Sequence, residues 1–338
     1  MAKTIEILLE QPYAKPQKSK ALFYLHGCMK PWYTPMQNSI PGLLQGYQSG
    51  LEFGDIVAAG MNLASRGHFL WFSGRPLEGV ELEQLASHSI YAELKQKVVL
   101  SGLVACKKMR GSHGLSSKLI INDEEIDFDD LKKIQLANKL GGMSSHACVV
   151  TTELEVLVIY QDFYTARTVL MNTGDLRPHL RGLFQDTRYT FLVGLICITS
   201  AQKESSWLVR RRLKSRGLKA TKIIRKWVSL GNVNLVHLLH LLEAECSVLN
   251  GDHNAAEESF KAAQSTASKH GFLQYKALSH ELASLYYASR GDTYWEEYNL
   301  DRGIEAYSDW QATAKVAELE KKKQMLLNAK STARSSAT

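Results

Sequence analysis

Two tandem copies of a helix–turn–helix pattern, between Leu235 and Lys321, constrain the fold of this chain more than any other stretch. Gly251-Asp252 and Gly291-Asp292 each stand between two segments with helical apolar spacing, and the two turns are 40 residues apart. A period of this length is typical of helical-repeat proteins. The same offset places small residues opposite small ones and large apolar residues opposite large ones: Ala244 and Ser284, Phe260 and Leu300, Ala263 and Gly303.

This pattern resembles a tetratricopeptide repeat, in which small residues let two helices approach closely and a large apolar residue fills the groove between them. The likeness implies that the repeat packing is carried by Ala244, Gly251, Ala256, Phe260, Ala263, Ser284, Gly291, Leu300 and Gly303. The second copy departs from the first, because Glu296 stands at the position of Ala256 and the period exceeds the usual value of about 34 residues. We therefore expect the second pair to cap the stack.

The composition indicates a globular protein with a large core. Of the 338 residues, 45% are hydrophobic and 22% charged, and the longest apolar stretch, 191–201, is too short to span a bilayer. The N-terminus does not read as a signal peptide, so we expect a cytoplasmic protein without a membrane partner. The five cysteines stand singly, which favours isolated core thiols over disulfides or zinc ligands.

Along the chain, every long apolar-periodic segment predicts a helix. The expected helices cover residues 36–52, 56–72, 77–100 with a continuation to 108, 131–140, 145–170, 180–202, 209–227, the two repeat pairs and 312–327. Short turns bearing Gly, Pro or Asp separate them, which predicts an all-α fold, an α-solenoid of antiparallel helix pairs. We expect a flexible segment over 1–20, a superhelix over 21–328 with its best-defined repeats at 235–321, and a disordered tail over 329–338.

The net charge of +7 is concentrated in one predicted helix, Val209–Trp227. It carries nine basic residues and no acid: Arg210, Arg211, Arg212, Lys214, Arg216, Lys219, Lys222, Arg225 and Lys226. Such a run can contact nucleic acid or an acidic partner. We favour a solvated face of an amphipathic helix whose Ile223, Ile224 and Trp227 point to the core, because few stacking aromatics lie nearby.

Two groups of polar residues raise the question of a metal. An acidic run of six residues, Asp123, Glu124, Glu125, Asp127, Asp129 and Asp130, lies in a predicted connecting loop over about 110–130. It lacks the spacing of a calcium loop, so we favour a loop that leads into a helix N-terminus. His237 and His240 stand three residues apart with no third ligand nearby, and packing explains them better than metal binding.

No phosphate-binding loop, dinucleotide fingerprint, nucleophile elbow or zinc-protease motif occurs in the sequence. We therefore expect no catalytic, cofactor-binding or metal-ligating residue and no cofactor. The aromatic set of the last repeat favours helix packing over an exposed groove: Tyr286, Tyr287, Tyr294, Trp295, Tyr298, Tyr307 and Trp310. The candidates for a partner surface are Arg210, Arg211, Arg212, Tyr294, Trp295 and Trp310.

A wider resemblance covers roughly residues 25 to 325. The segments that carry it include 40–56, 72–81, 123–130, 184–195, 272–283, 291–295, 303–307 and 310–316. They are similar to the tetratricopeptide-like superhelix of large signalling proteins that combine a serine/threonine kinase, a STAND-type AAA ATPase, a GAF domain and often a histidine kinase. The resemblance implies a sensor arm that binds partners and biases a nucleotide switch. This chain contains none of the catalytic modules.

Three functions remain open on the sequence. The first is a non-catalytic protein–protein interaction scaffold or sensor arm related to signal-transduction ATPase-kinases. The alternative is a basic superhelical nucleic-acid-binding protein that uses Arg210 to Lys226. The third, a helical enzyme, depends only on the histidine pair and the acidic loop.

Overall fold

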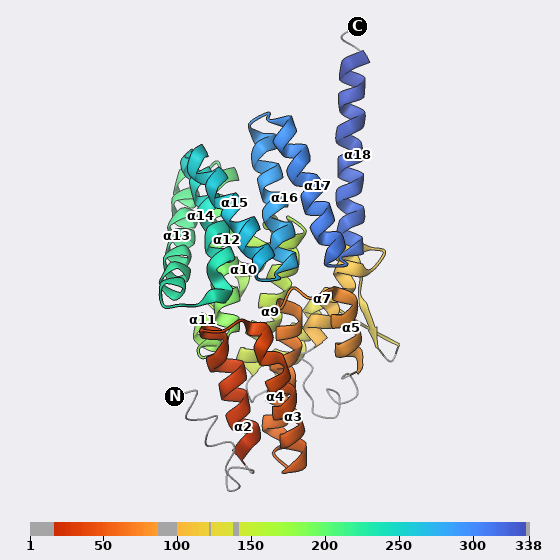
Figure 1. The fold of residues 1–338 in the computed structure, drawn as a ribbon, viewed down its shortest axis with the longest axis vertical. Helices are drawn as coiled ribbons and strands as arrows, with labels where there is room; N and C mark the ends of the chain where they lie inside the picture. Colours follow the sequence, from red (N-terminus) through yellow and green to blue (C-terminus); the bar gives the residue numbers. More distant parts are fainter. Residues whose placement is uncertain (1–16, 87–99, 122, 138–141, 336–338) are drawn as a thin grey trace.

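The computed structural model describes residues 17–86, 100–121, 123–137 and 142–335, and the fold of these residues is all-α, as predicted (Figure 1). Its helices are α2 Lys18–Leu22, α3 Ile40–Glu52, α4 Ile56–Phe72, α5 Leu77–Ala86, α7 Leu100–Arg110, α8 Phe128–Ala137, α9 Gly142–Ile159, α10 Phe163–Thr173, α11 Arg177–Leu180, α12 Gln185–Lys203, α13 Trp207–Ser229, α14 Val236–Asn250, α15 His253–Lys269, α16 Leu273–Ser289, α17 Thr293–Asp309 and α18 Thr313–Ser335. Shorter elements are the π-helix η2 Phe23–Met29, the 3₁₀ turns η3 Lys30–Trp32, η4 Met36–Ser39, η6 Gly114–Ser116 and η7 Val233–Leu235, and the strands β1 Leu119–Ile121 and β2 Glu124–Ile126. Among the described residues, no helix has the length and apolar character needed to cross a membrane.

Left-handed turn residues recur every 20 positions in the C-terminal half. They are Gly231 (φ 98°), Gly251 (φ 76°), Gly271 (φ 73°), Gly291 (φ 72°) and Gln311 (φ 63°). Between them α15, α16 and α17 are 17 residues long each. The side chains of Asp252 and Asp292 cap the following helices by accepting hydrogen bonds from Ala255 N and Trp295 N. The 40-residue period thus consists of two 20-residue half-units, each with one helix and one turn.

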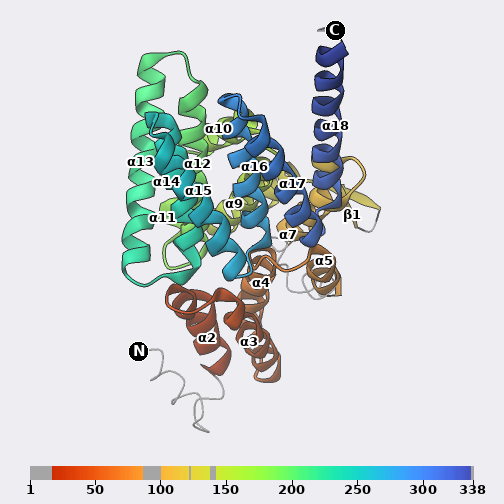
Figure 2. The ribbon, with the colours of Figure 1, turned by 45° about the horizontal axis from the view of Figure 1, so that its top comes forward.

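Most, but not all, of the nine residues expected to pack the repeat lie in its core. Seven are buried between α14, α15, α16 and α17: Ala244, Ala256, Phe260, Ala263, Ser284, Leu300 and Gly303. Gly251 and Gly291 are exposed, and they serve the turns through their positive φ. Consecutive helices in this half pack as antiparallel neighbours, as Figures 1 and 2 show.

Helix α12 lies beside α13 and α14 (Figure 2) and contacts α9, α10, α13 and α14. All its residues from Gln185 to Ala201 are buried. The N-terminal helices also meet the C-terminal ones, because Leu77 N donates to Trp310 O at 3.0 Å and the rings of Trp71 and Trp310 lie 5.5 Å apart. Such contacts between distant parts of the chain go beyond a simple solenoid, in which each unit touches only its neighbours.

A buried polar cluster joins four of these helices. Glu155 of α9 accepts hydrogen bonds from the indole of Trp71 at 2.9 Å and from the guanidinium of Arg188 at 3.0 Å. The hydroxyl of Tyr275 donates to the same carboxylate. Arg188 lies against the rings of Phe72 and Tyr275, with the guanidinium carbon 4.7 Å and 4.4 Å from the ring centroids. Glu155 and Arg188 are each 1% exposed, so water does not solvate either side chain. The contacts within the cluster must therefore offset the cost of removing both charges from water.

The predicted single helix over 145–170 is wrong, because α9 and α10 are separate helices. Gln161 has a φ of 59°, and Asp162 caps α10 by accepting from Thr165 N at 3.0 Å. Gln161 and Asp162 therefore end one helix and begin the next, as the Gly-Asp pairs do at the turns of the repeats. The break was missed because glutamine is not a residue that favours left-handed backbone.

Other boundaries also differ from the prediction. The segment 110–130 contains a β-hairpin in which Leu119 pairs with Ile126 and Ile121 with Glu124, so it is not a plain loop. Helix α2 begins at Lys18, inside the predicted flexible segment, because the buried Ser19 side chain donates to Gly46 O. Helix α18 extends to Ser335, well into the predicted disordered tail, since no Gly or Pro interrupts it.

Part of the long helix predicted over 77–100 lies outside the described residues. Its first ten residues form α5, and α7 begins at Leu100 and runs to Arg110. Residues 87–99 are not described, and neither are 1–16 and 336–338 of the predicted terminal segments.

Candidate functional site

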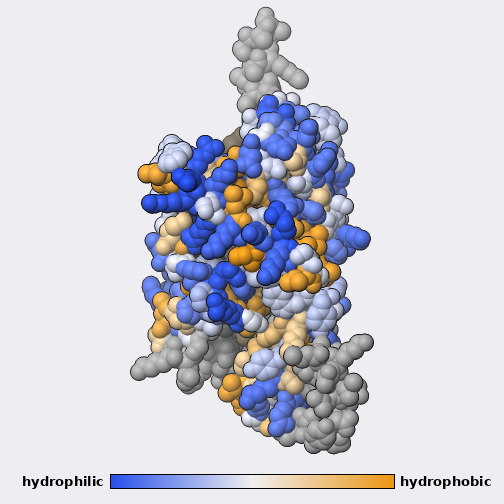
Figure 3. Space-filling view, turned by 90° about the vertical axis from the view of Figure 1, so that its left-hand side faces the viewer, coloured by the Kyte–Doolittle hydropathy of each residue, from blue (hydrophilic) through white to orange (hydrophobic). Residues whose placement is uncertain are grey.

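Seven exposed cations of α13 form a basic face on the surface of the molecule. We define it by its exposed cations: Arg210, Arg211, Arg212, Lys219, Lys222, Arg225 and Lys226. The opposite side of the helix, Leu213, Gly217, Ala220, Thr221 and Ile224, is buried, mainly against α12. The prediction of an amphipathic helix is therefore correct, with Ile224 fully buried and Ile223 and Trp227 partly so. Figure 3 looks onto the side of the molecule where α13 lies and shows hydrophilic residues broken by small apolar patches.

Most charges of the basic face lack an acidic partner. Within the described residues, Arg225 alone of this face forms an ion pair, at 3.1 Å from Glu243. At the helix start Arg211 lies over the ring of Trp207, 5.4 Å from its centroid. Trp207 is 64% exposed and Leu208 59%, so an apolar spot adjoins the cations.

The aromatic residues proposed as partner contacts are divided by the structure. Tyr294 and Trp295 are exposed at the start of α17, by 70% and 37%. Trp310 is fully buried, because the α17–α18 turn packs its indole against Trp71, and its place on a partner surface is therefore wrong. In Figures 1 and 2, α14 to α16 separate α17 from α13, so the arginines and these aromatic residues form no common surface.

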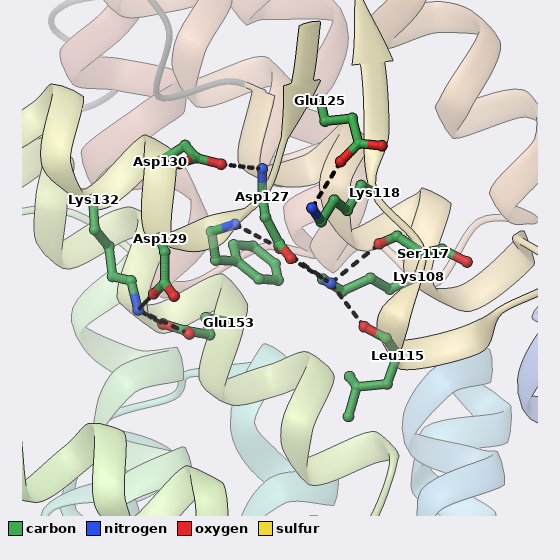
Figure 4. Close-up of polar contacts among 11 residues, drawn as sticks. Lys108, Leu115, Ser117, Lys118, Glu125, Asp127, Asp129, Asp130, Lys132 and Glu153 are labelled. Atoms are coloured by element: carbon green, nitrogen blue, oxygen red, sulfur yellow. Dashed lines mark hydrogen bonds and ion pairs between the residues drawn. The ribbon is translucent and has the colours of Figure 1, made fainter.

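Three of the six acids in the acidic segment, Glu125, Asp127 and Asp129, pair with lysines (Figure 4). Asp127 lies 3.0 Å from the amine of Lys108, which is 6% exposed and also donates to the carbonyls of Leu115 and Ser117. The side chain of Asp130 caps α8 by accepting from Asp127 N at 3.1 Å. The carboxylates at the base of the hairpin thus have structural partners.

Further along α8, Lys132 bridges two acids, at 2.8 Å from Asp129 and 2.9 Å from Glu153. Its hydrogen bond lowers the pKa of Asp129 below the usual range. Glu125 pairs with Lys118 on the hairpin at 2.7 Å. Across the described residues no group of three or more His, Cys, Asp or Glu side chains is arranged to hold a metal ion.

The two histidines of α14 have different surroundings. His237 is 1% exposed, and its ring stacks on Phe272 at 4.3 Å between centroids and lies tilted against Tyr275 at 5.2 Å. Burial lowers the pKa of His237 well below the usual value. His240 is partly exposed and lies 3.5 Å from Glu243. Packing, which the sequence favoured, describes His237 well.

A cavity that sequence reasoning missed lies where the α9–α10 turn, α12, α13, α14 and α16 meet. Its volume is about 460 Å³. The apolar part of its lining is Phe163, Val248, Leu249, Leu282 and Leu285, with Tyr286 beside them. Small-molecule sites are typically of this size and apolar character. Residues from five separate elements form it, so no local pattern in the sequence marks it.

The polar part of the cavity contains a buried acid. Glu245 is 4% exposed, and the side-chain amide of Gln202 donates to its carboxylate at 2.7 Å and to its backbone carbonyl at 3.1 Å. Burial raises the pKa of Glu245 to about 7. The buried hydroxyl of Thr199 and the side-chain amide of Gln161 have no hydrogen-bond partner among the described residues. Lys203 and Arg210, both exposed, complete the lining.

Comparisons with known proteins add no family to this picture. No family model matches the chain, and neither the curated proteins nor the solved structures contain a match.

Proposed function

We propose that this chain is a non-catalytic protein-interaction scaffold whose basic face on α13 binds an acidic partner protein. The observation that carries the proposal is the concentration of exposed, mostly unpaired cations on one side of a helix whose other side is buried. A fixed cationic surface steers acidic partners to itself and raises their rate of association. Trp207 and Leu208 add an apolar contact next to the charges.

Nucleic acid is the second candidate, and the pairing of Arg211 with the exposed Trp207 favours it. Binding of single strands uses several aromatic side chains on which bases stack. Near the basic face the other tryptophan, Trp227, is half-buried and packs on Trp32 at 5.4 Å between ring centroids. One exposed stacking residue is a weak platform, so we favour an acidic protein.

The relation to the sensor arms of STAND-type ATPase-kinases stays a proposal that only the sequence resemblance supports. We propose a cytoplasmic location as well, and the five free thiols fit a reducing compartment. ATP hydrolysis by the purified chain at enzyme-like rates would overturn the non-catalytic assignment.

Charge reversal on the basic face tests the interaction. The variant Arg210→Glu, Arg211→Glu, Arg212→Glu is compared with Lys133→Glu, Lys269→Glu, Lys321→Glu, which changes three exposed lysines on α8, α15 and α18. Both lower the formal net charge from +7 by six, so only the place of the change differs. Fluorescence anisotropy at low salt is measured with a labelled 20-residue poly-glutamate peptide and with labelled 20-mers of single-stranded RNA and duplex DNA.

We expect the peptide to bind wild type, with at least tenfold weaker binding to the arginine variant and little change in the lysine variant. Equal losses in the two variants would mean that the net charge is responsible and would contradict a specific surface. Tight nucleic-acid binding with a steep salt dependence, lost in the arginine variant alone, would support the second candidate instead.

A further inference from the structure

The cavity between α12, α14 and α16 contains polar atoms whose hydrogen-bonding capacity is unused. Buried side-chain groups are hydrogen-bonded in the large majority of cases. Here the Thr199 hydroxyl, in a residue that is 5% exposed, and both side-chain atoms of Gln161 lack a partner among the described residues. Because both residues line the same cavity, a ligand bound there could form hydrogen bonds with these atoms.

The acidic and basic groups of the lining are separated, with the acid in the buried part and the cations at the exposed rim. Glu245 is a buried acid whose nearest printed partner is the neutral amide of Gln202. Lys203 and Arg210 line the same cavity from exposed positions, and neither forms an ion pair with an acid in the described part of the chain. One buried carboxyl group and two exposed positive groups therefore face one space.

The apolar wall sets the remaining requirement. Leu282 and Leu285 of α16 and Phe163 of α10 offer a surface that favours a hydrocarbon or aromatic group. A ligand that fits the whole lining has a cationic group that can donate to a carboxylate, an anionic group that reaches the rim, and an apolar side chain.

We propose that this cavity binds a free α-amino acid with a large apolar side chain, its ammonium group at Glu245, its carboxylate toward Lys203 and Arg210, and its side chain against Leu282 and Leu285. The Thr199 hydroxyl and the Gln161 amide supply further hydrogen bonds. The inference is independent of the proposed partner surface on α13, with which it shares only Arg210.

The charge separation is what distinguishes this ligand from other small amphipathic molecules. An ammonium ion compensates the buried carboxylate with charge-assisted hydrogen bonds, which are roughly twice as strong as neutral ones. An amine without a carboxylate gains this contact but meets the two cations of the rim. A carboxylic acid without an amine gains the rim cations but leaves Glu245 uncompensated.

Isothermal titration calorimetry on the full chain at pH 8, above the pKa of Glu245, tests the proposal with four probes: L-phenylalanine, L-leucine, phenethylamine and 3-phenylpropanoate. The variants are Glu245→Gln, which keeps the size and an acceptor for Gln202, and Lys203→Gln at an exposed position. The control is Glu243→Gln, an acid on the same helix that lies outside the cavity and pairs with Arg225. Thermal unfolding without ligand confirms that each variant is folded.

We expect L-phenylalanine or L-leucine to bind, and both single-charge analogues to bind at least about tenfold more weakly. Glu245→Gln weakens binding of the amino acid at least tenfold, Lys203→Gln weakens its binding but does not weaken that of phenethylamine, and Glu243→Gln leaves binding of the amino acid unchanged. Absence of binding of both amino acids at 10 mM, or equal affinity for phenethylamine and L-phenylalanine, would overturn the proposal. Binding to folded Glu245→Gln at wild-type affinity would do so as well.

Discussion

The pair Glu155–Arg188 shows how much one buried residue can depend on its neighbours. Each side chain is 1% exposed, so neither charge is solvated. The Glu155 carboxylate is instead surrounded by three donors, the groups of Trp71, Arg188 and Tyr275. Removing one member of such a cluster leaves the others buried without partners.

Replacement of Glu155 by Leu should therefore destabilise the protein strongly. We expect a loss of about 3 to 5 kcal/mol in the free energy of unfolding, because the Arg188 charge stays buried and unpaired. Urea unfolding followed by circular dichroism measures this loss. The control is Glu305→Gln, which breaks an exposed pair with Arg302 and should leave the stability almost unchanged, because water screens the two charges. Similar losses of unfolding free energy in both variants would show that the buried cluster stabilises the protein no more than an exposed ion pair does.

Glu245 predicts a pH dependence of stability that can be assigned to one residue. Its pKa is raised from 4.5 to about 7 by burial, so between these values the folded state keeps a proton that the unfolded state releases. Wild-type stability then contains a term that is present below about pH 4.5 and is lost as the pH rises through 7.

The variant Glu245→Gln has no such proton. We expect its free energy of unfolding to rise relative to that of wild type by about 2 to 3 kcal/mol between pH 4.5 and pH 8. This figure follows from 1.36 kcal/mol per unit of difference between the folded and unfolded pKa values. Denaturant unfolding at closely spaced pH values measures the difference between the two proteins. A constant difference across this range would show that Glu245 titrates as an ordinary exposed acid.

At the level of elements, the turns determine where helices end. The glycines at 231, 251, 271 and 291 have positive φ, as does Gln311. A side chain added at Gly251 meets nothing within 4 Å, so its cost is conformational alone. Gly74 also has a positive φ, of 77°, but a Cβ there would lie 2.5 Å from the carbonyl oxygen of Gly271. This glycine lets the end of α4 approach the start of α16.

The two glycines should therefore respond differently to alanine. Gly251→Ala should cost about 1 kcal/mol, the strain of a left-handed residue with a side chain. Gly74→Ala should cost about 1 to 3 kcal/mol more, because the backbone of α4 and α16 must also separate. Thermal unfolding of both variants gives the comparison. Equal losses of stability in the two variants would mean that the backbones at these two turns can move apart without strain.

How far the elements could be predicted depends on their turns. Gly251-Asp252 and Gly291-Asp292 could be recognised, and the helices between them are where the repeat placed them. The turn at Gln161 carries no such signal, so the sequence predicts one helix where the structure has α9 and α10. The hairpin over 119–126 was missed because each of its strands has only three residues.

The candidate sites divide in the same way. The residues of the basic face of α13 lie close together in the sequence. Helical spacing alone is therefore enough to predict that they share an exposed face. The burial of Trp310 depends on Trp71, more than 230 positions earlier, and the cavity around Glu245 needs five elements to assemble. Contacts between such distant positions have no local pattern that a single sequence can reveal.

At the scale of the whole molecule, Asn234 links the N-terminal segment to the start of the C-terminal repeats. Its carbonyl oxygen accepts from Met36 N at 2.9 Å, and its amide donates to the carbonyls of Pro31 and Thr34 at 2.7 Å and 2.8 Å. The residue is 2% exposed. It satisfies three backbone groups of the N-terminal segment from the start of the C-terminal repeats.

Replacement of Asn234 by Ala should loosen this junction. We expect a loss of about 2 to 4 kcal/mol, because buried backbone groups lose their partners. Hydrogen exchange should show faster exchange of the Met36 amide, while amides within α16 keep their protection. Unchanged exchange at Met36 would indicate that water or another group replaces the asparagine.

The contact of α4 and α5 with the last repeat can form only late in the synthesis of the chain. Glu78 meets Gln311 across 233 residues, and Trp71 next to this junction is covered by Trp310. At about 5 to 20 residues per second, a ribosome needs roughly 12 to 47 s to make that interval. During this time the N-terminal helices have an apolar surface with no partner yet synthesised. A nascent chain stopped before residue 310 should therefore bind general chaperones more than the finished protein does.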